Sequence, residues 1–114
     1  MTIKRIDPDT RWSEAVVHND TIYYTSVPEQ LDGDITEQTA DTLAAIDTLL
    51  HRLGSDKSKI LDATIFLADK ADFTGMNAAW DAWVVAGSAP VRCTVQAALM
   101  DPKYKVEIKI IAAL

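Results

Sequence analysis

The sequence contains one cysteine and two histidines, too few for a disulfide or a typical zinc site. A single cysteine cannot close a disulfide within its own chain, and Cys93, His18 and His51 cannot supply four zinc ligands. We therefore expect no bound metal, and we expect the reducing cytoplasm as the compartment of the protein.

Glycine, long apolar runs and basic residues are also scarce. Four glycines are too few for the loop that cradles phosphates in nucleotide-binding proteins. No apolar run approaches the roughly 20 residues of a membrane span, and the first ten residues lack the apolar segment of a signal peptide. Seventeen acidic against eleven basic residues give a net charge of -6, which repels a phosphate backbone. We expect neither a membrane nor a nucleic acid as partner.

The remaining composition is that of an ordinary folded protein, with 48% hydrophobic and 25% charged residues. A chain of 114 residues suits one domain, and no linker or repeat divides it. We therefore expect a single domain over residues 1–114.

The first part of the chain predicts three short strands over residues 2–6, 14–18 and 21–26, with Asn19 and Asp20 suited to the hairpin turn between the last two. A helix follows. Asp34 and Glu37 have the spacing of a capping box, and Gly54 suits the left-handed position just past the helix end. Apolar residues between them recur every three or four positions: Ile35, Leu43, Ile46, Leu50 and Leu53.

The second part predicts a strand over residues 59–67, a helix over 72–85, and closing strands over 91–99 and 105–112. One stripe of the helix is apolar: Phe73, Met76, Trp80, Trp83 and Val84. The element order βββ-α-β-α-ββ indicates an α+β fold, with two helices on one face of a single sheet. Since the other face would stay uncovered, we expect copies of the chain to associate.

Arg92 and Glu107, on the two closing strands, are the candidates for chemistry. A guanidinium binds a carboxylate through two parallel hydrogen bonds, but Arg92 could instead cap a sheet edge or pair with one of the seventeen acids of the chain. A carboxylate such as Glu107 can orient and deprotonate a water, but Lys105 and Lys109 flank it as they would on a solvated face. Without a histidine nearby in sequence, Cys93 is typical of a small core residue rather than a nucleophile.

Several separated segments together resemble the RidA (YjgF) family, which includes RutC-like proteins. They are residues 90–95 (Pro-Val-Arg-Cys-Thr-Val), 97–99, 106–108 (Val-Glu-Ile), 73–80 (Phe-Thr-Gly-Met-Asn-Ala-Ala-Trp) and 12–16. The resemblance covers essentially the whole chain and is greatest with the short YoaB-like branch. It implies a chorismate-mutase-like fold assembled as a homotrimer, with clefts between neighbouring subunits.

The same resemblance implies a reaction and roles for particular residues. The reaction is hydrolysis of reactive 2-imino and enamine acids to 2-keto acids and ammonia, without a cofactor. Arg92 falls on the arginine that binds the substrate carboxylate, and Glu107 on the glutamate that positions the attacking water. Thr94 falls where a backbone carbonyl contacts the substrate nitrogen. Trp12 falls on an aromatic residue that walls the cleft from the adjacent subunit.

Two segments differ from the pattern of the family. Tyr24-Thr25-Ser26 stand where the family commonly has Ser-Gly-Gln, whose backbone helps to hold the carboxylate, so Thr25 is a candidate contact of the substrate. Cys93 and Thr94 stand where Ser and Cys usually follow the arginine, which makes Cys93 a second candidate contact. An alternative function is a non-catalytic trimer that binds small carboxylates such as 2-keto acids in the same cleft. RNA cleavage has been attached to relatives, and the acidic charge disfavours it here.

Overall fold

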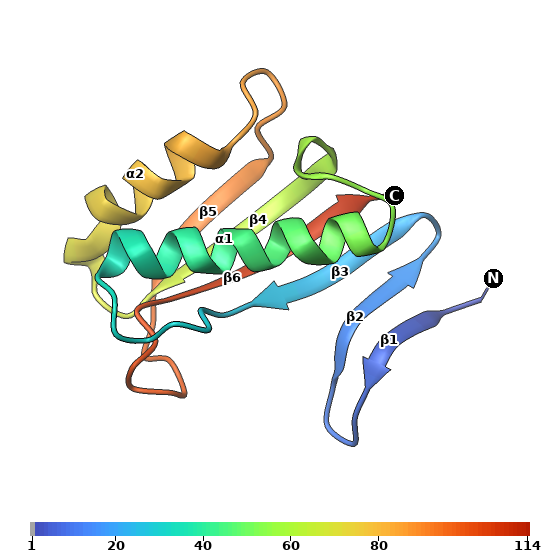
Figure 1. Cartoon of the computed structure of the whole chain (residues 1–114), viewed down its shortest axis with the longest axis horizontal. Helices are drawn as coiled ribbons and strands as arrows, with labels where there is room; N and C mark the ends of the chain where they lie inside the picture. The colour runs from blue at the N-terminus through green and yellow to red at the C-terminus, as the bar shows by residue number, and fades with distance from the viewer. Residues whose placement is uncertain (1) are drawn as a thin grey trace.

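The structure, a computed structural model, describes residues 2–114 as one mixed sheet with two helices on one face (Figure 1). The elements are β1 (Lys4–Pro8), β2 (Ser13–His18), β3 (Thr21–Ser26), α1 (Ile35–Arg52), β4 (Ile60–Leu67), α2 (Phe73–Trp83), β5 (Val91–Gln96) and β6 (Val106–Ala113). Short 3₁₀ helices, Lys57–Lys59 and Lys70–Asp72, precede β4 and α2. The predicted order βββ-α-β-α-ββ is therefore confirmed.

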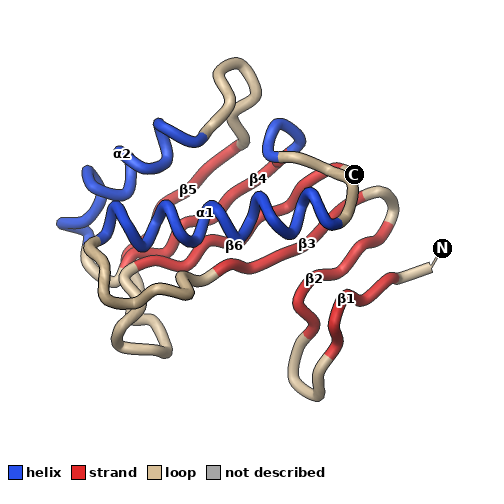
Figure 2. Tube along the Cα trace, viewed as in Figure 1, coloured by secondary structure: helices blue, strands red, loops and turns tan. Residues whose placement is uncertain are grey.

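The strands lie in the spatial order β1-β2-β3-β6-β4-β5 (Figure 2). All neighbouring pairs are antiparallel except β4 and β5, which run parallel because α2 carries the chain back between them. The last strand thus occupies the middle of the sheet, and β5 forms one edge.

Helix α1 begins and ends where its sequence predicts. The Asp34 side chain accepts a hydrogen bond from the Glu37 backbone N–H, and the Glu37 side chain accepts one from the Asp34 backbone N–H, which completes the capping box. The helix ends at Arg52, and Gly54 takes a φ of 83°, in the left-handed region. Its apolar stripe packs into the core, where Leu43, Ile46 and Leu50 are buried.

Several expected boundaries are shifted. Helix α2 is shorter than residues 72–85, because Asp72 belongs to the preceding 3₁₀ helix and Val84 is already extended. Phe73 is 45% exposed and so lies outside the core stripe to which we assigned it. The first strand covers residues 4–8 rather than 2–6, and β5 ends at Gln96 rather than at residue 99.

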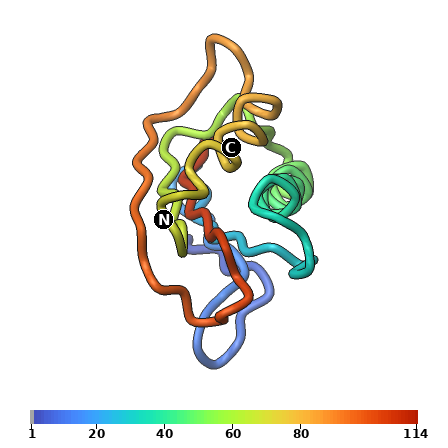
Figure 3. The backbone as a smooth tube through the Cα atoms, turned by 90° about the vertical axis from the view of Figure 1, so that its left-hand side faces the viewer, coloured from blue at the N-terminus to red at the C-terminus, as the bar shows by residue number. Residues whose placement is uncertain are grey.

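Both helices lie on the same side of the sheet (Figures 1 and 3). Strand pairing then assigns each residue to a face, since paired residues point the same way. Three rows of side chains cross the face without helices, and we call this surface the open face. The rows are Tyr23, Ile111, Asp62 and Val91; Thr25, Lys109, Thr64 and Cys93; and Glu107, Phe66 and Val95.

The buried amide of Gln38 joins α1 to two loops. Its Nε2 donates to the Leu31 carbonyl (3.1 Å) and the Lys103 carbonyl (3.0 Å), and its Oε1 accepts from the Lys105 N–H (2.8 Å). The chain between Gln96 and Val106 is thereby fixed to the start of α1.

Replacing Gln38 with alanine is expected to destabilise the fold by about 2–5 kcal/mol, because three backbone groups lose a buried partner. The expected result is a clear fall in the thermal unfolding midpoint. Gln30→Ala, which removes an exposed glutamine close by in the chain, is the matched control and should leave that midpoint nearly unchanged. Equal midpoints for the two variants would show that the Gln38 bridge contributes little.

Within residues 2–114, neither helix is long and apolar enough to span a bilayer.

Candidate functional site

Arg92 lies under α2 at the edge of the core. Its row on the helix-covered face is Tyr24, Ile110, Ala63 and Arg92, of which the first three are buried and Arg92 is half-buried. Its Nη1 donates to Asn77 Oδ1 at 2.8 Å. The guanidinium carbon lies 5.2 Å from the centre of the Trp80 ring and 6.0 Å from that of Phe73.

No acid neutralises this guanidinium. The ion pair found among residues 2–114 joins Arg52 to Asp7, at 2.7 Å, so Arg92 has no carboxylate partner within the described chain. The sequence left open that Arg92 pairs with a neighbouring acid, and the structure shows no such pair within residues 2–114. A half-buried cation held by a neutral side chain keeps its affinity for an external anion.

Helix α2 is fixed in place by contacts with α1. Gly75 permits a close approach, because a Cβ there would lie 2.5 Å from Ile35 Cγ2. The hydroxyl of Thr36 donates to the Gly75 carbonyl at 2.9 Å, and Trp83 Nε1 donates to Asp47 Oδ2 at 2.9 Å. These contacts hold the surface of α2 that faces Arg92.

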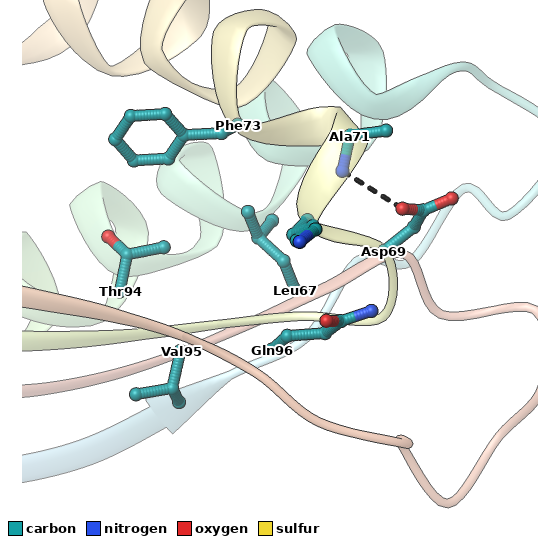
Figure 4. A pocket seen from close by; sticks show the side chains of 8 residues that line it. Leu67, Asp69, Ala71, Phe73, Thr94, Val95 and Gln96 are labelled. Atoms are coloured by element: carbon teal, nitrogen blue, oxygen red, sulfur yellow. Dashed lines mark hydrogen bonds between the residues drawn. The ribbon is translucent and has the colours of Figure 1, made fainter.

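Thr94 shares the helix-covered side of β5 with Arg92 and lines an open pocket of about 490 Å³. Figure 4 shows Thr94, Leu67 and Phe73 around this space, with Val95 on the other side of the strand. The buried hydroxyl of Thr94 has no hydrogen-bond partner among the described residues.

The backbone of Thr94 faces the free edge of the sheet. The Ala97 N–H donates to the Leu67 carbonyl at 2.9 Å, so residue 97 points its backbone groups toward β4. Because successive residues of a strand alternate, the N–H and C=O of Thr94 point away from β4. Within residues 2–114, that side of β5 has no neighbouring strand. The Thr94 carbonyl is therefore free to accept a hydrogen bond from a ligand.

Glu107 lies on the open face, half-buried, in a broad groove of about 730 Å³. Trp12, Thr25, Met100 and Tyr104 also line this groove. Trp12 is 70% exposed, so its ring is available to a neighbouring molecule. The structure thus brings together Trp12, Thr25 and Glu107 around one groove.

Cys93 is exposed on the open face, so its interpretation as a small core residue is wrong. The alternation of β5 is the reason: its neighbours Arg92 and Thr94 take the covered side, and β5, at the edge of the sheet, has no second layer over Cys93. The Cys93 sulfur lies 3.9 Å from the hydroxyl of Thr64.

The side chains of Tyr24 and Ser26 point to the helix-covered face, and Tyr24 also lines part of the groove of Glu107. Both are buried beneath α1, where the Ser26 hydroxyl donates to the Thr42 carbonyl at 2.8 Å. Burial raises the pKa of the Tyr24 phenol above its ordinary value, so the ring stays neutral. Of the three residues, only Thr25 points its side chain toward the open face.

Arg92 and Glu107 do not meet within one chain. Their side chains point to opposite faces, and β4 lies between their strands. Glu107 is level with Val95, which lies three residues along β5 from Arg92. The two residues are therefore separated by about 10 Å across the strands and by about 10 Å along them. The chain carries two separate groups of candidate residues: Arg92 and Thr94 at β5, and Trp12, Thr25 and Glu107 in the groove.

Two features of the site were not singled out from the sequence. Asn77 was part of the resembling segment 73–80, and its spacing from Phe73 and Trp80, four and three residues, could have placed it on the same helix face. Met100 and Tyr104 lie in a loop, where no periodicity indicates which side chains turn toward the groove.

Comparison with known proteins identifies the class to which the fold and these residues belong. A family model described as endoribonuclease L-PSP matches residues 2–114. A solved structure of a YjgF family member from Neisseria meningitidis superposes with a TM-score of 0.95 at 47% identity, covering 99% of this chain and 95% of that chain. The chain belongs to this family, known as YjgF, RidA or RutC.

Within the family, the chain is similar to named bacterial proteins over its whole length. The RutC family protein YoaB of Escherichia coli K12 is 72% identical over 114 residues, which is 100% of both chains. A RutC family protein of Haemophilus influenzae is 51% identical over 98% of both. These names assign no activity.

More distant relatives are named for a reaction. Reactive Intermediate Deaminase A of Arabidopsis thaliana is 32% identical, over 90% of this chain and 58% of that protein. The 2-iminobutanoate/2-iminopropanoate deaminase of Capra hircus is 29% identical, over 89% of this chain and 78% of that protein.

Proposed function

We propose that this protein hydrolyses short 2-imino acids, and the enamines in equilibrium with them, to 2-keto acids and ammonia. The observation that carries the proposal is the guanidinium of Arg92, half-buried at the sheet edge, bonded to a neutral amide and unpaired with any acid of the described chain. The names of the two deaminase relatives support the choice of reaction.

The main requirement of this reaction is that the protein positions the substrate and the attacking water. Arg92 binds the carboxylate through parallel hydrogen bonds, and the Thr94 carbonyl accepts one from the imine N–H. Glu107 takes a proton from a water molecule as the oxygen of that water bonds to the imine carbon. That proton passes to the nitrogen, which gives a carbinolamine. Its hydroxyl then loses a proton to Glu107, and Glu107 passes this proton to the nitrogen, so that ammonia leaves with the C–N bond as the C=O bond forms. No redox change occurs, so no cofactor is needed.

We further propose that the site forms between protomers of a homotrimer. Arg92 and Glu107 of one chain lie on opposite faces, farther apart than a short imino acid can span. In the proposed assembly, the β5 edge of one protomer, with Arg92 and Thr94, meets the groove of its neighbour, with Trp12, Thr25 and Glu107. The open face carries exposed apolar side chains such as Tyr23, Val91 and Val95, which association would bury.

The direct test is ammonia release from freshly generated 2-iminopropanoate by the purified protein. Release well above the spontaneous rate is the expected result. Calorimetry with 2-ketobutyrate distinguishes the alternative, a carboxylate-binding trimer. Keto acid binding without faster ammonia release would favour that alternative.

Glu107→Gln is expected to lower kcat about 100-fold or more, because a general base contributes about that much, while 2-ketobutyrate still binds. The measurements are ammonia release and calorimetry on the same preparation. Glu29→Gln removes another carboxylate of the same groove and is the matched control. Full turnover by the Glu107 variant would remove this residue from the proposed mechanism.

A further inference from the structure

Asn77 is the residue that holds the candidate anion-binding group. It lies on the same surface of α2 as Phe73, one turn before it, and Trp80, one turn after it. Its Oδ1 accepts the hydrogen bond from Arg92 Nη1, and the two rings lie close to the guanidinium. Asn77 is the hydrogen-bonding member of this set.

The chemistry of the contact determines the orientation of the amide. An arginine side chain only donates hydrogen bonds, so the oxygen of the Asn77 amide must face it. Asparagine is a weaker helix former than alanine or leucine, so the helix alone does not favour it at this position. An aspartate would bind the guanidinium more strongly, but it would also neutralise the positive charge.

We propose that Asn77 is a positioning residue that orients Arg92 with an uncharged acceptor, leaving the positive charge and the remaining N–H groups for the substrate carboxylate. The inference rests on the proposed function and assigns a role to a residue that does not touch the substrate. Trp80, 5% exposed, supports one side of the guanidinium, and α2 is itself fixed to α1 through Gly75.

The test compares three proteins in calorimetric binding of 2-ketobutyrate: the wild type, Asn77→Ala and Asn77→Asp. Asn77→Asp keeps the size and the hydrogen bond but adds a charge that competes with the ligand, so we expect affinity to fall about tenfold or more. Asn77→Ala frees the guanidinium without neutralising it, so its loss should be smaller. The expected order of affinity is wild type, then Ala, then Asp.

If Asn77 only kept Arg92 in place, the order of affinity for 2-ketobutyrate would differ. The Asn77→Asp variant would then bind at least as well as the wild type, because an aspartate would hold Arg92 at least as firmly as asparagine. Thermal unfolding is the second measurement. The Asn77→Asp variant should be at least as stable as the wild type, since it gains an ion pair, and yet bind the keto acid most weakly. Asn19→Asp, in the β2–β3 turn, adds the same charge far from β5 and should leave affinity unchanged.

The outcomes separate the two proposals. Wild-type affinity in the Asn77→Asp variant would overturn the role of Asn77 while leaving the function of Arg92 intact. A wild-type protein that binds no 2-ketobutyrate would overturn the proposed function, and the role of Asn77 with it.

Discussion

Replacing Arg92 with alanine should lower kcat/KM for 2-iminopropanoate about 100- to 10,000-fold, because two hydrogen bonds to a charged group are worth about 3–6 kcal/mol together. Most of this loss should appear as a raised KM, since the carboxylate is held in the ground state as well as in the transition state. Arg92→Lys keeps the charge but loses the planar fork, so its loss should be large but smaller.

The fold should survive the alanine substitution. Arg92 is half-buried at the sheet edge, and the chain's buried cluster does not include it. Gel filtration and circular dichroism check that assembly and secondary structure persist. Lys4→Ala removes an exposed cation from β1, at the opposite edge of the sheet, and is the matched control. Undiminished hydrolysis by the Arg92→Ala variant would remove the basis of the proposed mechanism.

Mixing two inactive variants should restore activity. Arg92→Ala subunits keep Glu107, and Glu107→Gln subunits keep Arg92, so a cleft between unlike neighbours can hold both intact residues. In a cyclic trimer that contains both variants, one of the three clefts is intact. Random assembly from equal amounts makes about three-quarters of the trimers mixed, so about a quarter of the wild-type activity should return.

The experiment is performed by refolding the two variants together and measuring ammonia release against each variant refolded alone. The control is the same two variants mixed after folding, without exchange of subunits. If Arg92 and Glu107 served one site from the same chain, no mixture could hold an intact site. Activity that stays at the level of the separate variants would therefore contradict the inter-subunit cleft.

Features set by neighbouring residues could be predicted from the sequence. The capping box of Asp34 and Glu37 and the left-handed Gly54 are local, and both were placed correctly. The last strand, predicted over residues 105–112, is found over 106–113, with Val106, Ile108 and Ile110 buried. Each of these depends on residues a few positions apart, which a pattern can reveal.

Features set by distant parts of the chain could not be predicted in the same way. The exposure of Cys93 follows from the place of β5 at the sheet edge, which alternation alone does not give. Phe73 has the spacing of a core residue but stands where α2 begins, over an open pocket. The separation of Arg92 from Glu107 depends on which strand lies between theirs, and only the assembled sheet decides that.

The two groups of candidate residues also occupy different stretches of the gene. The β4-α2-β5 unit, residues 60–96, contributes Asn77, Arg92 and Thr94. The groove of Glu107 is built instead from β2 and β3 with the segments beside them, from Ala45 of α1, and from the last strand with its preceding loop. Mutations that reshape the groove therefore leave the sequence of the proposed anion-binding unit unchanged. In the proposed site, selection can therefore change which ligand side chain the groove accepts, while the unit that binds the acid group is inherited unchanged.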